Sequence, residues 1–178
     1  MKYWLLAMVI CSHVALFGQE AEVTPKDSID YSTVDGIVKA YYKITSGPAG
    51  KRDWKSYRTL FRPEAQINAR VFNMDGKLQY VHGTLDEYIG MVDEYFTINA
   101  YFEQEIGRQT HQYQDIAQVF SAYQNKLATN QKTYHRGIKS LQLVFDQKRW
   151  WIVNILYNNE SVKTPIPNEM LFEKYREE

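Results

Sequence analysis

The stretch IKSLQLVFDQKRWWIVNILYN, residues 138–158, decides the fold class. Residues 138–145 and 150–158 are dominated by aliphatic, aromatic and β-branched side chains, which favour β-strands. Four polar residues, Asp146 to Arg149, separate the two runs and are enough for a tight connection. We therefore predict two neighbouring antiparallel strands in a sheet.

The chain before this pair supplies more strands. Residues 101–111 and 116–126 are also long and rich in aromatic and β-branched side chains, while residues 127–135 form a polar loop. Further upstream, residues 66–73 and 77–81 flank Asp75-Gly76, a pair that favours turns with positive φ. The sequence thus predicts an early hairpin and four long antiparallel strands at the end.

Three helices are expected around the hairpin. The first begins near Ser32 or Thr33, because either side chain can act as an N-cap. Asp53 can cap a second, shorter helix, which Arg62-Pro63 should stop. Thr84 with Glu87 three residues later is a capping-box pattern for a third helix. The first helix carries an apolar stripe at helical spacing, formed by Val34, Ile37, Val38, Tyr41 and Ile44.

This element order predicts an α+β fold. Helices gathered on one face of an antiparallel sheet make a two-layer arrangement. We expect a single domain in which a strongly curved antiparallel sheet wraps around the N-terminal helices. Such a sheet leaves a cavity at its open end, between the sheet and the first helix.

The N-terminus has the pattern of a signal peptide. Lys2 precedes an apolar run that extends to Phe17, and Gly18 offers a small residue at the cleavage point. The run is too short to span a bilayer, so we expect no stable membrane anchor after cleavage. The prediction is an exported protein, periplasmic or secreted.

Cys11 is the only cysteine and lies in this leader. Ile10 precedes it where a lipidated cysteine needs a small residue, so we expect no lipid anchor. Without Cys11 the chain has no thiol for catalysis, disulfides or metal binding. The predicted organisation is a signal peptide at 1–18, a flexible arm at 19–31, one domain at 32–162 and a C-terminal tail at 163–178. The tail is expected to form a last helical turn on the surface or to be disordered.

Composition narrows the partners. The 178 residues include 21 basic and 21 acidic side chains, so no net field attracts nucleic acid. After the leader, His82, His111 and His135 have no metal-ligand spacing, and phosphate-loop and dinucleotide motifs are absent from the sequence. We therefore expect neither a metal site nor a cofactor. Aromatic residues make up 15% of the chain, which suits half-wet cavities and interfaces.

The final strands and the element order resemble a known superfamily. QVFSAY at 118–123, GIKSLQL at 137–143 and RWWIV at 149–153 are similar to small exported bacterial members of the nuclear transport factor 2-like (NTF2-like) superfamily. This superfamily, which includes the SnoaL-like polyketide cyclases, ketosteroid isomerases and scytalone dehydratases, shares a cystatin-like α+β cone. The resemblance covers nearly all of the chain after the leader and implies a pocket. It does not imply one activity, because the scaffold hosts enzymes, binding proteins and assembly modules.

The catalytic residues of those enzymes do not carry over. The isomerases use a carboxylate base with a tyrosine and a protonated aspartate, and no aspartate here matches that base. The dehydratases use histidine with aspartate and tyrosine. His111 and Asp115 are close in sequence, but they lie at a predicted strand end. We therefore assign no catalytic residue.

Strand alternation selects the candidate ligand-binding residues. Glu103 and Glu105 share one strand face with Tyr101. Two neighbouring carboxylates would repel, and burial would raise the pKa of one of them, which suits a general base. A solvated face is the favoured alternative for the two glutamates. Ser121 and Tyr123 share a face of the next strand, and Tyr123 and Tyr157 are candidate phenol donors.

In the last two strands, one face is nearly pure core. It comprises Leu141, Leu143, Phe145, Trp151, Val153, Ile155 and Tyr157. The other face mixes apolar bulk with the neutral polar groups of Ser140, Gln142 and Asn154. Its apolar members are Ile138, Val144, Trp150, Ile152 and Leu156. A mixed face of this kind suits a ligand pocket or a homodimer interface equally well.

Three functions follow from these patterns. The first is a pocket protein that binds a small apolar or amphipathic molecule outside the cytoplasm. The second is a lyase or isomerase with Glu103 or Glu105 as base and Tyr123 or Tyr157 as acid. The third is an interaction module that forms a homodimer through the mixed sheet face.

Overall fold

The computed structural model describes residues 29–72, 77–128 and 132–176. The predicted signal peptide with Cys11, the start of the arm and the turn at Asp75-Gly76 lie outside the described residues. The helices are α1 (Val34–Thr45), α2 (Trp54–Arg58) and α3 (Leu85–Ile98). The strands are β1 (Phe61–Phe72), β2 (Leu78–Thr84), β3 (Phe102–Tyr113), β4 (Ile116–Lys126), β5 (His135–Phe145) and β6 (Trp150–Asn159), and two 3-10 turns, η1 (Asn168–Met170) and η2 (Glu173–Tyr175), follow.

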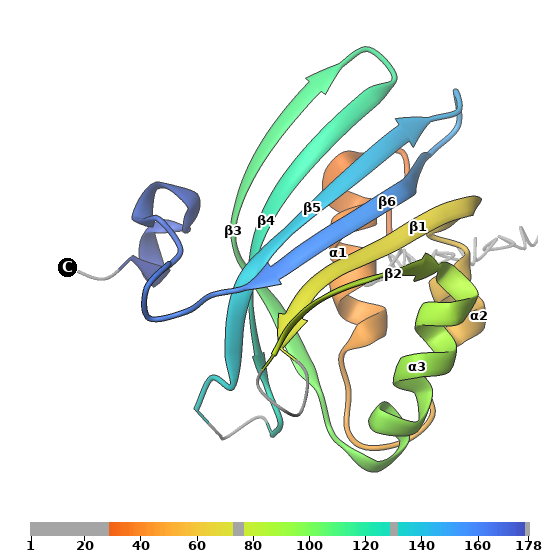
Figure 1. Ribbon diagram of the computed structural model, residues 1–178. Helices are drawn as coiled ribbons and strands as arrows, with labels where there is room; N and C mark the ends of the chain where they lie inside the picture. The colour runs from red at the N-terminus through yellow and green to blue at the C-terminus, as the bar shows by residue number, and fades with distance from the viewer. Residues whose placement is uncertain (1–28, 73–76, 129–131, 177–178) are drawn as a thin grey trace, which may run out of the picture.

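One curved sheet organises the fold, with strand order β2-β1-β6-β5-β4-β3 (Figure 1). Four of the five pairings are antiparallel, as expected from the sequence, but β1 runs parallel to β6. The parallel pairing joins the early hairpin to the last strand. All three helices lie on the concave side of the sheet, which confirms the α+β prediction (Figure 1).

The predicted helix caps are present. The side chains of Thr33 and Asp53 accept hydrogen bonds from the main-chain N–H groups of Gly36 and Ser56, and Thr84 and Glu87 form the expected capping box. The second helix ends earlier than predicted, at Arg58. Phe61, which falls within the helix predicted to reach Arg62, instead begins β1.

A β-bulge in β6 corrects the predicted strand faces. Gln142 pairs with Asn154 but Leu143 pairs with Ile152, so Val153 is an extra residue. One extra residue reverses the direction of the side chains that precede it. Trp150 and Ile152 are therefore buried in the core, whereas alternation had placed Trp151 and Val153 there.

The main core lies between α1 and the inner face of the sheet. Ile37 and Val38 of α1 pack there with fully buried residues of three strands, namely Val119, Leu141, Ile152 and Ile155. This packing fixes the helix over the centre of the sheet. It also leaves α3 to cover the inner side of β1 and β2 (Figure 1).

The C-terminal segment packs on the opposite side of the sheet (Figure 1). Ile166 and Leu171 are buried against Ile106 and Ala122 in a second cluster, and the Phe172 N–H donates to the Ile106 carbonyl at 2.8 Å. Gly107 permits this approach, because a Cβ there would lie 1.9 Å from the Met170 carbonyl oxygen. For residues 163–178 we expected a last helical turn on the surface or disorder, and the structure shows two short 3-10 turns, η1 and η2, with Ile166 and Leu171 buried against the sheet.

Candidate functional site

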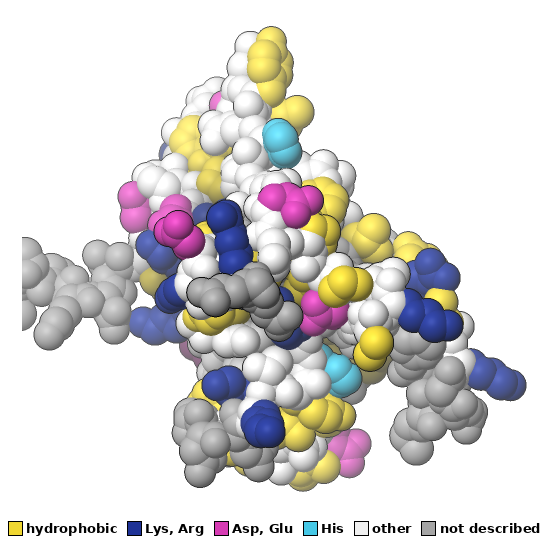
Figure 2. Space-filling model, turned by 90° about the vertical axis from the view of Figure 1, so that its left-hand side faces the viewer, with side chains coloured by type: hydrophobic (Ala, Val, Ile, Leu, Met, Phe, Trp, Pro, Cys, Tyr) yellow, Lys and Arg dark blue, Asp and Glu magenta, His cyan; other side chains and the backbone are white. Residues whose placement is uncertain are grey.

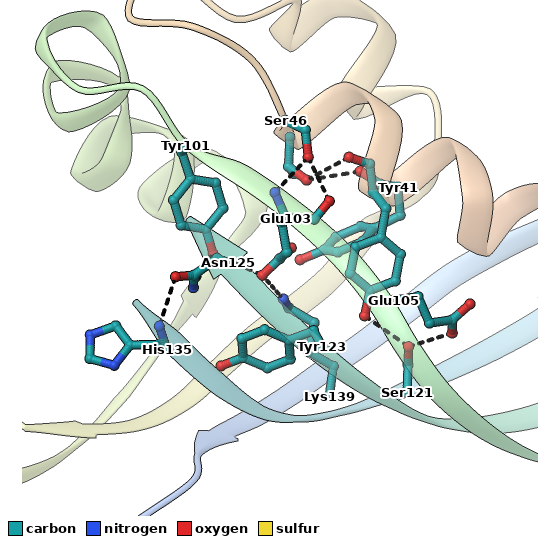
Figure 3. A network of polar contacts seen from close by, with 12 residues as sticks. Tyr41, Ser46, Tyr101, Glu103, Glu105, Ser121, Tyr123, Asn125, His135 and Lys139 are labelled. Atoms are coloured by element: carbon teal, nitrogen blue, oxygen red, sulfur yellow. Dashed lines mark hydrogen bonds and ion pairs between the residues drawn. The ribbon is translucent and has the colours of Figure 1, made fainter. Parts of the chain in front are cut away.

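A buried ion pair lies at the centre of the concave face. Lys139 of β5 is 4% exposed, Glu103 of β3 is 7% exposed, and the Lys139 ammonium contacts the Glu103 carboxylate directly across β4 (Figure 3). The favoured sequence interpretation, a solvated face for the two glutamates, is therefore wrong for Glu103. Its strand face points into the protein because it is covered by α1.

Four tyrosines surround the Lys139 ammonium, and we call them the tyrosine cage. The nitrogen lies 3.6 Å from the ring centroid of Tyr123, 5.5 Å from Tyr42, 5.6 Å from Tyr41 and 5.8 Å from Tyr157. The negative faces of aromatic rings attract a cation at such distances. The cage thus replaces part of the hydration that Lys139 loses on burial.

Burial and charge set the protonation of this cluster. Burial lowers the pKa of Lys139, and the Glu103 carboxylate opposes that shift. Burial, and then the charge of Glu103, raises the pKa of Tyr157 to about 12 and the pKa of Tyr123 further still. The cage phenols are therefore neutral hydrogen-bond donors at neutral pH.

Further contacts fix the Glu103 carboxylate in place. Tyr101 donates its hydroxyl to Glu103 Oε1 at 2.8 Å, and Asn125 Nδ2 donates to the Tyr101 hydroxyl at 3.1 Å. Ser46 exchanges two 2.9 Å hydrogen bonds with the main chain of Glu103 (Figure 3). Lys139 and Tyr101 both contact Oε1 of Glu103, so this oxygen is held by two partners from its own chain.

Glu105 has a separate set of partners. Arg108 donates to both of its oxygens, at 2.8 and 2.6 Å, and Ser121 Oγ donates to Oε1 at 2.5 Å. The Tyr42 hydroxyl lies 2.8 Å from Ser121 Oγ, and Arg108 also bonds Asp35 of α1. Each glutamate thus has its own cation, which removes the repulsion on which the predicted general base depended.

The structure divides the predicted ligand-binding residues between the two faces of the sheet. Five belong to the inner clusters just described: Glu103, Glu105, Ser121, Tyr123 and Tyr157. The other three lie on the outer face. There Ser140 accepts from Gln118 at 3.0 Å, Asn154 accepts from Asn68 at 2.8 Å, and Gln142 is exposed.

Sequence reasoning missed Lys139, which holds the inner cluster together. The sequence did contain a signal for Lys139. In β5 it lies on the same strand face as Leu141 and Leu143, which alternation had assigned to the core. A lysine in such a position needs a buried partner of opposite charge. The cage residues Tyr41 and Tyr42 were also missed, although Tyr41 belongs to the apolar stripe of α1.

A cavity of about 200 Å³ lies between α3 and the inner face of β1 and β2, and we call it the α3 cavity. Its lining comprises Ile67, Ala69, Val81, His82, Gly83, Glu87, Tyr88, Met91 and Tyr157. Tyr157 belongs to both the cavity wall and the tyrosine cage. The space between the sheet and α1, where the sequence predicted the cavity, is filled by the core and the cage.

Among residues 29–72, 77–128 and 132–176, no group of three histidine, cysteine, aspartate or glutamate side chains is placed to hold a metal ion. None of the helices in this described part is long and apolar enough to cross a membrane.

Solved structures share this architecture. An NTF2-like protein of unknown function from Pseudomonas putida aligns with a TM-score of 0.56 at 8% identity, over 79% of this chain and 92% of the other. The chain has the NTF2-like fold. A cystatin-like fold protein from Nostoc punctiforme aligns with a TM-score of 0.53 at 10% identity, over 75% and 97% of the two chains. A ketosteroid isomerase-like protein from Parabacteroides distasonis aligns with a TM-score of 0.53 at 9% identity, over 76% of this chain and 94% of the other.

At these identities, the similarity establishes the fold and leaves the activity open. No protein-family model and no curated protein matches the sequence. The function of the NTF2-like fold in this chain must therefore be argued from its own residues.

Breaking the ion pair should unfold the protein more easily. Glu103→Gln or Lys139→Met leaves an uncompensated buried group, so each should lower the free energy of unfolding by about 3–5 kcal/mol. The double variant should lose less free energy of unfolding than the two single variants lose together. Urea denaturation measures all three values.

The exposed pair Arg62–Glu64 is the matched control. Arg62→Ala should cost about 1 kcal/mol or less, because exposed ion pairs contribute little. Single Glu103 and Lys139 variants as stable as Arg62→Ala would contradict a structural role for the buried pair.

Proposed function

We propose that the protein is an exported binding protein that takes a small apolar or amphipathic molecule into the α3 cavity. The observation that carries this proposal is the cavity's lining, in which apolar side chains predominate over a few polar groups. Ligand pockets have this composition, since apolar walls provide affinity and a few polar groups fix orientation. The leader-like residues 1–18 support a site of action outside the cytoplasm.

The positions of the carboxylates favour binding over lyase or isomerase chemistry. Glu103 and Glu105 are outside the cavity lining, and each is held by a cation. Glu87 does line the cavity, but its carboxylate accepts hydrogen bonds from the Thr84 main-chain N–H at 2.7 Å and from the Thr84 hydroxyl at 2.9 Å. A general base needs a carboxylate within hydrogen-bond reach of the bound substrate. Of these three carboxylates, only Glu87 meets this condition, and the hydrogen bonds from Thr84 lower the pKa of Glu87 and so weaken it as a base.

The tyrosine cage supports a preformed cavity. Tyr157 is held beside Lys139 on one side and lines the cavity on the other. A wall fixed before binding loses little conformational entropy when the ligand arrives. The ion pair thereby contributes to affinity without touching the ligand.

Filling the cavity should abolish binding. Ala69 is 4% exposed and lines the cavity, so Ala69→Leu places extra methyl groups in the ligand's space. We expect single-ring and short-chain compounds to raise the melting temperature of the native protein and to leave that of Ala69→Leu unchanged. Thermal-shift measurements with lipid, steroid and polyketide-like fragments test this.

Met91→Leu is the matched control, because it changes a lining residue while nearly conserving volume. It should retain binding within about threefold. A native protein that no such fragment stabilises would count against the binding function.

A homodimer through the outer sheet face is the second candidate function. The specific observation is a group of exposed apolar side chains on that face: Tyr113, Ile116, Phe120 and Leu156, which are 38–70% exposed. Figure 2 shows apolar side chains gathered at the top of the molecule, where the β3–β4 hairpin ends. Ser140 and Gln142 lie among them as neutral hydrogen-bonding groups, a mixture common in protein interfaces.

Sedimentation velocity tests the dimer. The native chain should sediment as a dimer, and Phe120→Lys should convert it to a monomer because a charge would be buried at the interface. Ile98→Lys, at an exposed position of α3 on the other side of the sheet, should leave the dimer intact. A monomeric native protein would exclude this candidate.

A further inference from the structure

Two tyrosines that line the α3 cavity have hydroxyls without a hydrogen-bond partner among the described residues. Tyr88 of α3 and Tyr157 of β6 line the cavity, and within the described part of the chain neither hydroxyl makes a hydrogen bond. In the same described ranges, the Tyr57 hydroxyl is buried and has no hydrogen-bond partner, whereas the hydroxyls of Tyr88 and Tyr157 retain accessible surface. The accessible space that both side chains share is the cavity.

Both phenols are donors at neutral pH. Burial raises the pKa of Tyr88 well above its usual value, and the phenol of Tyr157 adds to that shift. Burial and the charge of Glu103 raise the pKa of Tyr157 to about 12. Because both hydroxyls keep accessible surface, each can donate a hydrogen bond to water or to a ligand in the cavity.

The nearby carboxylates do not provide that partner. Glu87 is held by the cap of α3, and Glu103 is held by Lys139 and Tyr101. The negative charge of Glu87 at the cavity wall also disfavours an anionic ligand. Glu103 and Lys139 lie outside the lining and balance each other, so they do not offset this effect.

Building on the proposed function, we infer that the cavity selects small, neutral, mostly apolar molecules with a carbonyl oxygen, which accepts hydrogen bonds from the hydroxyls of Tyr88 and Tyr157. A carbonyl oxygen has two lone pairs and can accept from both donors at once. The class comprises ketones, aldehydes and esters. The apolar part of the lining, formed by Ile67, Ala69, Val81 and Met91, contacts the hydrocarbon part of the ligand.

The volume limits the size of this ligand. A closed apolar cavity of about 150 Å³ holds benzene. The α3 cavity of about 200 Å³ therefore accepts one ring with a short substituent. Acetophenone and α-methylstyrene are suitable probes, because they have nearly the same shape and differ in a carbonyl oxygen against a methylene group.

The test is an NMR titration of the full chain with each probe. The dissociation constants are measured for the native protein, Tyr88→Phe, Tyr157→Phe and the double variant. Removing both hydroxyls should weaken the binding of acetophenone by about tenfold relative to that of α-methylstyrene. Each single variant should show part of this loss of affinity. Tyr95→Phe, on α3 outside the cavity lining, should leave the ratio unchanged.

The outcomes separate this inference from the proposed function. If both probes bind and their ratio is the same in the native protein and the double variant, the carbonyl preference is overturned and the binding function stands. If neither probe binds the native protein and other single-ring compounds also fail, both are overturned. A loss of binding for both probes equally in the Tyr→Phe variants would likewise overturn the carbonyl preference.

Discussion

The buried pair between Lys139 and Glu103 is the interaction on which the rest of the structure depends. It joins β5 to β3 across β4, beneath α1, at a place where neither charge reaches water. A charge in such a place requires a partner and further polar contacts. The cage of four tyrosines, together with Tyr101 and Ser46, provides those contacts from α1, from the loop after it, from β4 and β6, and from the residue before β3.

This constraint explains why the concave face has its cavity beside α3 and not beside α1. The pair and its cage occupy the centre of the concave face, so the space beside α1 is filled and the cavity lies beside α3. Tyr157 connects the two regions because it is a member of both. A small neutral ligand would thus meet a wall whose position is fixed by a charge pair it does not touch.

Much of the fold was predictable from local patterns. Thr33, Asp53 and Thr84 act as the caps that their sequence positions suggested, and the long strands lie where β-branched and aromatic residues gather. The parallel pairing of β1 with β6 was not predictable, because it depends on tertiary contacts. The bulge at Val153 was missed because alternation assumes that every strand residue has one partner.

The site was predictable in part. Alternation correctly placed Glu103 and Glu105 on one face, but it could not supply their partners. Glu105 reaches Arg108 because the irregularity between Glu105 and Gly107 in β3 brings residues three apart to the same side. Lys139 could have been found by a different inference. A lysine on the same strand face as buried leucines implies that a carboxylate from another strand lies beside it.

The most direct test of this account is the NMR signal of the Lys139 side chain, assigned by its absence in Lys139→Arg. The account predicts an ammonium that exchanges slowly with water, with Cε methylene protons shifted to high field by the Tyr123 ring, whose centroid lies 3.6 Å from the nitrogen. A fast-exchanging ammonium with the proton shifts of a solvent-exposed lysine would contradict it.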